Sequence, residues 1–206
     1  MSDAVAPSPA APSGRYSAVA IALHWVIAVL LVSMVFYGWW MEGLREQLFA
    51  GEASVELVSG AYNWHKTAGI LVLLLSLARL AWRLTHTPPA LPMHMKTWER
   101  YFARFTHVAF YAVMIGMPIG GYVTASSFGD SFPILLFNEI SLPKLPVPQT
   151  EAFQGFSGSA HGAGGWVIFA LLALHAGGAL KHHVLDRDGV LTRMIPGLNI
   201  PKQDKA

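Results

Sequence analysis

Four of the nine histidines in this chain lie inside long apolar stretches at two matching depths, where an imidazole is unusual. His24 and His175 fall near one predicted membrane face, and His65 and His161 fall near the other. An imidazole inside a bilayer costs free energy unless it is paired or ligated. Two histidine pairs at matching depths therefore predict two buried metal centres.

The spacing of the last two histidines predicts that both centres lie along one face of a helix. His161 and His175 are 14 residues apart, about 21 Å of α-helix and close to a whole number of turns at ~3.6 residues per turn. His24 lies about two turns inside the first apolar stretch, level with His175. His65 is expected in the first turn of the second stretch, level with His161.

Glycines follow three of these histidines by three or four residues, which places them on or near the same helix face. Without side chains there, a flat macrocycle can approach the helix; close packing of helices through small residues explains each glycine equally well. They are Gly69, Gly164, Gly165 and Gly178.

Composition predicts an all-α integral membrane protein. Hydrophobic residues make up 53% of the chain and charged residues 13%, and the mean hydropathy is +0.43. Four stretches reach the ~20 residues that cross the hydrocarbon, and backbone groups there must be satisfied within helices. The chain is therefore predicted to be a four-helix bundle, with helices at about 17–41, 63–84, 101–125 and 159–184.

The distribution of Lys and Arg predicts that both termini are cytoplasmic. Eleven basic residues fall before the first helix, around the second connection or at the C-terminal end: Arg15, Arg79, Arg83, Lys96, Arg100, Arg104, Lys181, Arg187, Arg193, Lys202 and Lys205. The other two connections hold only Arg45, Lys66 and Lys144 among many acids. Basic residues favour the cytoplasmic side.

The remaining segments are predicted from turn residues and polarity. Residues 1–14 are expected to be a disordered tail ahead of a retained helix, 15–196 the membrane domain, and 197–206 a C-terminal tail. The segment 44–58 alternates acidic and apolar residues and is predicted to form a short surface helix. A loop without periodicity is expected over 130–158, as a binding lid or docking surface.

The absence of cysteine restricts the cofactor. It excludes covalent haem attachment, cysteine-ligated iron–sulfur clusters and disulfides, which leaves non-covalent b-type haem as the cofactor suited to paired imidazoles. Single membrane histidines also make interhelical hydrogen bonds. A di-iron bundle would need Glu-x-x-His pairs, none of which occurs, and a proton-coupled transporter would need a buried acidic relay that the helices lack.

The order and spacing of several short motifs over residues 15–196 resemble the bacterial cytochrome b561 family. The motifs are Arg15-Tyr16-Ser17, Leu23-His24-Trp25, Trp64-His65-Lys66, Arg79-Leu80, Arg83-Leu84, Pro88-Pro89, Phe105-Thr106-His107, Leu174-His175-Ala176 and His182-His183. This family is related to the cytochrome b subunits of hydrogenases and formate dehydrogenases. The resemblance implies a protein of the bacterial inner membrane with two bis-histidine b haems that exchanges electrons with ubiquinone or another quinone.

The resemblance also implies individual roles. His24 and His175 would ligate the inner haem, and His65 and His161 the outer haem, in agreement with the depths above. The end of the fourth helix lies near a quinone site in such proteins, which here points to His182 with Lys181; the alternative for His182 is an ordinary basic residue at a helix end.

Haem carboxylates need compensating partners, and Arg binds carboxylates through two parallel hydrogen bonds. The candidates are Arg15, Tyr16, Arg79 and Arg83 at the inner level and Lys66 and Asn63 at the outer level. Interfacial anchoring is the competing explanation for them. His107 is expected near the inner haem, as a residue behind the ligands or beside the quinone, and could also replace His24 or His175.

Two functions fit these expectations. One is an oxidoreductase that oxidises superoxide at the outer haem and reduces ubiquinone; the few basic residues of the outer loops weigh against capture of an anion. The other is an electron-transfer subunit that docks a periplasmic dehydrogenase or soluble cytochrome. The expected partners are the lipid bilayer, quinone, and superoxide or a periplasmic redox protein, with no nucleic acid.

Overall fold

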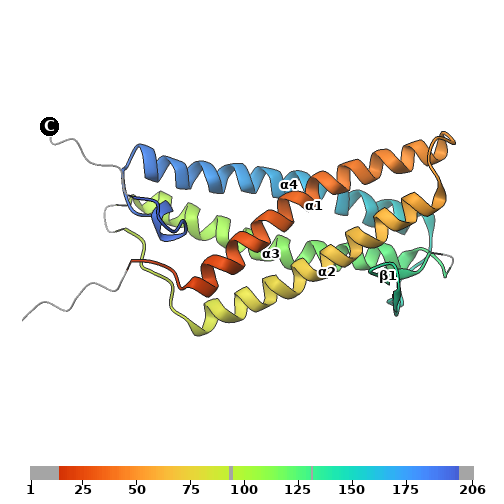
Figure 1. Ribbon diagram of the computed structural model, residues 1–206, viewed down its shortest axis with the longest axis horizontal. Helices are drawn as coiled ribbons and strands as arrows, with labels where there is room; N and C mark the ends of the chain where they lie inside the picture. Colours follow the sequence, from red (N-terminus) through yellow and green to blue (C-terminus); the bar gives the residue numbers. More distant parts are fainter. Residues whose placement is uncertain (1–13, 93–94, 131, 200–206) are drawn as a thin grey trace, which may run out of the picture.

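The computed structural model describes residues 14–92, 95–130 and 132–199 (Figure 1). Nearly all of the tail predicted over 1–14, and most of the tail predicted over 197–206, lie outside the described residues. The described chain forms four long helices: α1 (Ala18–Phe49), α2 (Val55–Thr85), α3 (Thr97–Ser127) and α4 (Glu151–Val184). Two short strands, β1 (Ile134–Leu136) and β2 (Ile140–Leu142), and a 3-10 turn, η1 (Leu191–Arg193), complete it.

Three of the four helices begin at a residue whose hydroxyl satisfies one of the first free amide groups, and at the start of α3 the carboxylate of Glu99 accepts from the amide of Lys96. The hydroxyls of Ser17, Ser54 and Thr150 accept from the amide three residues on. All four helices are long and apolar enough to span a membrane, which confirms the predicted all-α bundle. At 31 to 34 residues they are about 46–51 Å long, so their ends extend beyond a hydrocarbon core of about 30 Å.

Three local predictions are wrong, because the helices continue past the hydropathic stretches that revealed them. The segment 44–58 is the end of α1, a turn at Gly51 with φ of +77°, and the start of α2, not a surface helix. The expected loop 130–158 contains the β1–β2 hairpin and the first two turns of α4. His65 is ten residues after Val55, nearly three turns inside α2, rather than in its first turn.

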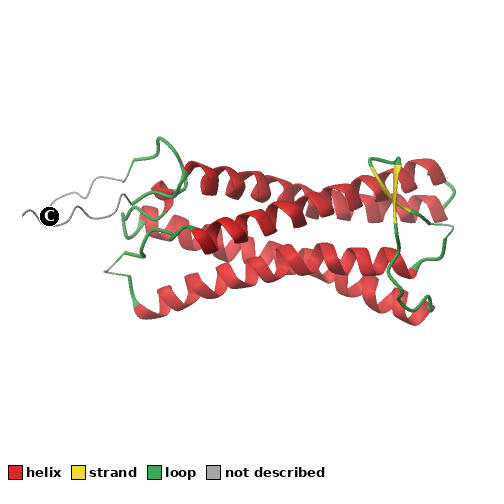
Figure 2. Ribbon diagram, turned by 90° about the horizontal axis from the view of Figure 1, so that it is seen from below, coloured by secondary structure: helices red, strands yellow, loops and turns green. Residues whose placement is uncertain are grey.

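The helices run alternately up and down, so α1 and α2, α2 and α3, and α3 and α4 pack as neighbours (Figures 1 and 2). The start of α1 and the end of α4 lie at one end of the bundle, here called the terminus end, together with η1. The β1–β2 hairpin lies at the opposite end, here called the hairpin end. Among the described residues, the start of α1 and the end of α4 therefore share one end, which is compatible with the predicted placement of both termini on one side of the membrane.

The interior between the four helices is apolar. Its most buried members are Ile27, Leu31, Val35, Val72, Met114 and Ile168. Many large apolar side chains, among them Val29, Leu74, Val108 and Phe169, are instead exposed on the outer surface. An outer surface of this kind suits contact with lipid rather than water.

Candidate metal centres

The pair at the hairpin end joins His65 of α2 to His161 of α4. Each histidine is ten residues after the first residue of its helix, so the two lie at the same depth. Their ring centroids are 6.0 Å apart and the ring planes are nearly perpendicular, at 82°. The structure therefore brings together the two residues that were predicted as one ligand pair.

The pair at the terminus end joins His24 of α1 to His175 of α4. Their ring centroids are 6.1 Å apart with an interplanar angle of 57°. His107 of α3 is also close, with its centroid 5.6 Å from that of His175. This end thus gathers three imidazoles, as the position of His107 in the sequence predicted.

The spacing within both pairs fits one metal ion between two opposed imidazoles. With metal–nitrogen distances of about 2 Å, and each centroid about 1.1 Å behind its nitrogen, the centroids would lie about 6 Å apart. The Nδ1 atoms of His24, His65 and His161 are buried without a hydrogen-bond partner. Buried polar atoms without a partner point to a group that the described residues do not supply.

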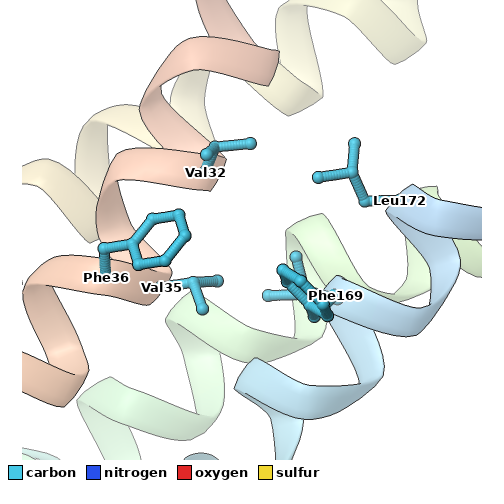
Figure 3. A pocket seen from close by; sticks show the side chains of 6 residues that line it. Val32, Val35, Phe36, Phe169 and Leu172 are labelled. Carbon is cyan, nitrogen blue, oxygen red and sulfur yellow. The ribbon is translucent and has the colours of Figure 1, made fainter. Parts of the chain in front are cut away.

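The space between the two levels is apolar. A cavity of about 60 Å³ lies between α1 and α4 and is lined only by aliphatic and phenyl side chains (Figure 3): Val32, Val35, Phe36, Ile168, Phe169 and Leu172. Figure 3 shows Val32, Val35 and Phe36 on α1 facing Phe169 and Leu172 on α4 across this space. It separates the histidine levels with material of low dielectric constant.

Of the residues predicted to compensate haem carboxylates at the terminus end, Arg79 is within electrostatic range of all three histidines there. Its positive charge interacts electrostatically with His24 and His175, and its guanidinium lies 5.8 Å from the ring centroid of Tyr111. Arg83 interacts electrostatically with His107. Arg15 precedes α1 and donates to the carbonyl of Ile195 at 3.4 Å.

Tyr16 and Arg15 belong to a contact between the start of α1 and the C-terminal segment. The amide of Tyr16 donates to the carbonyl of Arg193 at 3.4 Å, and the indole of Trp25 donates to the carbonyl of Met194 at 2.8 Å. The C-terminal segment therefore covers the end of the bundle beside His24.

Lys66 and Asn63, the residues predicted to compensate haem carboxylates at the hairpin end, contact each other, and Lys66 also contacts the hairpin segment. The ammonium of Lys66 donates to Asn63 Oδ1 and to the carbonyl of Pro133, both at 3.1 Å. The hydroxyl of Thr67 accepts from the amide of Phe137 at 2.9 Å, and the ring of Phe137 meets Trp64 edge to face. The hairpin is thus fastened to the turn of α2 that carries His65.

The predicted quinone residues lie in a charged cluster where α4 meets the start of α3. His182 Nδ1 is 2.8 Å from Asp188 Oδ2 and 2.9 Å from Asp186 Oδ2. Lys181 Nζ is 2.5 Å from Glu99 Oε1 and 2.7 Å from Asp186 Oδ2. Glu99, His182 and Asp186 offer a metal-like set of donors, but Lys181 already balances both of its carboxylates.

Two residues around the histidines were missed from the sequence. Tyr37 stacks on His65, and Gly121 faces His161. Neither belongs to a histidine motif, so no local pattern marked them. Of the glycines predicted to border a macrocycle, Gly164 instead admits the side chain of Met117, in agreement with the alternative of close helix packing.

Four apolar helices long enough to span a membrane, with imidazoles facing one another in pairs inside the bundle, indicate a multi-pass membrane protein with two candidate metal sites. Residues 15–197 match the family described as prokaryotic cytochrome b561, and the chain belongs to this family. Its members are membrane electron-transfer proteins that bind haem b.

Two relatives from Escherichia coli (strain K12) are similar along most of their length. Cytochrome b561 homolog 2 is 30% identical over 181 residues, which cover 88% of this chain and 91% of the relative. Cytochrome b561 homolog 1 is 27% identical over 186 residues, which cover 88% of this chain and 97% of the relative.

Proposed function

We propose that this protein is a di-haem b cytochrome that transfers electrons between a periplasmic donor and a membrane quinone. The observation that carries the proposal is the pair of facing imidazoles at each level, with centroids 6.0 and 6.1 Å apart. His65 and His161 would hold one haem, and His24 and His175 the other. Haem supplies one-electron chemistry, and the protein supplies ligation, spacing and a dry surrounding.

The terminus end is the proposed quinone side. The contacts of His182 Nδ1 with Asp186 and Asp188 orient the ring, and Nε2 would be the atom that meets the quinone. Lys181 beside it would hold a proton or a negative oxygen. The basic residues around this end support its placement in the cytoplasm, with the chain in a bacterial inner membrane.

Superoxide is the proposed donor at the hairpin end. Lys66 and Lys144 lie within electrostatic range of each other, and Lys66 acts on His65. Two neighbouring cations, one of them beside a histidine, favour an anion. Arg45, the third basic residue of these connections, is instead paired with Glu42.

A docking subunit is the second candidate, and an exposed surface supports it. Phe132, Phe137 and Ile140 expose 54–63% of their surface on or beside the hairpin. Apolar side chains grouped at an exposed tip suit contact with a protein donor. In that role the protein would carry electrons without being an enzyme itself.

The proposal is tested by an optical redox titration of the purified protein with haem quantitation. Two haems per chain and two bis-imidazole centres are expected. One haem per chain, or a colourless preparation, would contradict it.

The donor is tested by mixing the same preparation with superoxide and a soluble ubiquinone. Quinone reduction that weakens with salt, and that Lys66→Gln slows and makes less dependent on salt, supports the oxidoreductase. Reduction of the haems only by a protein donor supports the subunit.

A further inference from the structure

The two imidazoles at the hairpin end each rest against a helix that supplies neither of them. His65 belongs to α2 and meets α1, whereas His161 belongs to α4 and meets α3. Their planes are 82° apart, compared with 57° at the other level. An imidazole that rotates freely about its side-chain bonds has no fixed interplanar angle to its partner. The contacts behind the two rings therefore determine this angle.

Gly121 is the contact behind His161. A Cβ atom at position 121 would lie 2.8 Å from Cε1 of His161, 3.3 Å from Nδ1 and 3.4 Å from Nε2. Real Cβ atoms essentially never approach a carbon to 2.8 Å. The missing side chain therefore lets the whole ring lie against the backbone of α3, close to the carbonyl of Met117, in one orientation.

Tyr37 is the contact behind His65. The two rings are stacked, with planes 16° apart and centroids separated by 6.3 Å. The phenol of Tyr37 donates to the carbonyl of Ala61 at 3.2 Å, one turn before His65 on the same helix. The tyrosine is thereby tied to the turn that carries the histidine, and its ring gives the imidazole a parallel face.

We propose that Gly121 and Tyr37 are positioning residues that hold the rings of His161 and His65 nearly perpendicular to each other as axial ligands of one haem. This inference rests on the proposed function, since it requires a haem between these rings. Neither residue touches the metal; each acts through the imidazole in front of it.

The angle between axial imidazoles has a spectroscopic consequence. In a low-spin ferric haem, perpendicular ligand planes leave two iron orbitals nearly equal in energy, which gives a strongly anisotropic electron paramagnetic resonance signal. Planes closer to parallel split these orbitals and reduce the anisotropy. The hairpin-end haem should therefore give the lower-field of two signals, and His161→Ala identifies that signal by removing it.

The test compares three alanine variants of the solubilised, haem-loaded protein. Gly121→Ala should move the hairpin-end signal to higher field or abolish it, while the other signal stays in place. Gly120→Ala is the matched control on the same helix, because its Cβ meets nothing within 4 Å and borders a cleft of about 400 Å³. Gly38→Ala is the control for ordinary contact with a histidine ring, because its Cβ would lie 3.6 Å from Cε1 of His65, without the close approach expected at position 121.

Tyr37→Leu provides an independent arm, should Gly121→Ala prevent folding. It removes the parallel ring and its hydrogen bond and should shift the same signal, whereas Tyr37→Phe keeps the ring and should shift it less. Equal shifts in Gly120→Ala and Gly121→Ala, or an unchanged signal in both Gly121→Ala and Tyr37→Leu, would overturn the inference. Wild-type protein without two bis-imidazole signals would instead contradict the proposed function.

Discussion

The two ends of the bundle hold similar imidazole pairs in different surroundings. At the hairpin end, His65 and His161 are backed by Tyr37 and Gly121, and the described residues place no further histidine ring against them. At the terminus end, His107 lies as close to His175 as His24 does, and Arg79 acts on all three rings. The described residues thus give the hairpin-end pair no third imidazole, whereas the terminus-end pair has a third imidazole and a nearby charge.

The sharpest way to test this difference is to remove a ligand at the hairpin end. His161→Ala should lower bound haem from about two to about one per chain, because the described residues place no other imidazole against His65. Pyridine haemochrome quantitation measures it. His86→Ala is the control, since His86 stacks on Trp82 beyond the end of α2 and should keep full haem. Full haem in His161→Ala would refute the assignment of His161.

The same change at the terminus end should have a smaller effect. His24→Ala should retain much of its second haem, with an altered spectrum, because His107 can take the vacant position opposite His175 or beside it. The double variant with His24→Ala and His107→Ala should lose that haem. If the single variant loses it completely, His107 is no reserve ligand and the comparison between the ends fails.

Removing the imidazole of the proposed quinone site should leave both proposed haems unchanged. His182→Ala should slow oxidation of the reduced protein by quinone roughly tenfold, the effect of one lost hydrogen bond to a charged group at about 1.5 kcal/mol. Stopped-flow spectroscopy with a soluble quinone measures this rate. Asp188→Asn should give a partial effect, and an unaltered rate in His182→Ala would exclude His182 from the site.

The smallest expected effect concerns the fastening of the hairpin. Thr67→Val removes the acceptor of the Phe137 amide, which should destabilise the closed hairpin by about 1 kcal/mol. Hydrogen exchange at this amide should accelerate roughly fivefold, while haem content stays full. Thr85→Val, whose hydroxyl bonds only within its own helix end and to His86, is the control. Equal protection in both variants would show that Thr67 does not hold the hairpin.

The histidine levels could be predicted from the sequence because they depend on helix geometry alone. Fourteen residues between His161 and His175 specify both a distance and a direction, whatever the neighbouring helices do. The contacts of Gly121 and Tyr37 could not be predicted, because they depend on how α3 and α1 are rotated about their own axes. At the hairpin end neither helix carries a predicted ligand that would indicate which of its faces meets the histidines.

The ends of the helices were underestimated for another reason. Glu42, Glu46, Glu52 and Glu56 lower the hydropathy where α1 finishes and α2 starts, although helix formation depends on caps such as Ser54 rather than on hydropathy. The hairpin escaped notice because three-residue strands are too short for an alternating pattern to be recognised.

Because α4 carries one histidine of each pair, any tilt or rotation of this helix moves both histidines at once. A change at one level that leaves the other undisturbed must therefore come from α1, α2 or α3. Substitutions that separate the properties of the two levels should accordingly accumulate on those three helices, and substitutions that bend the middle of α4 should alter both levels together.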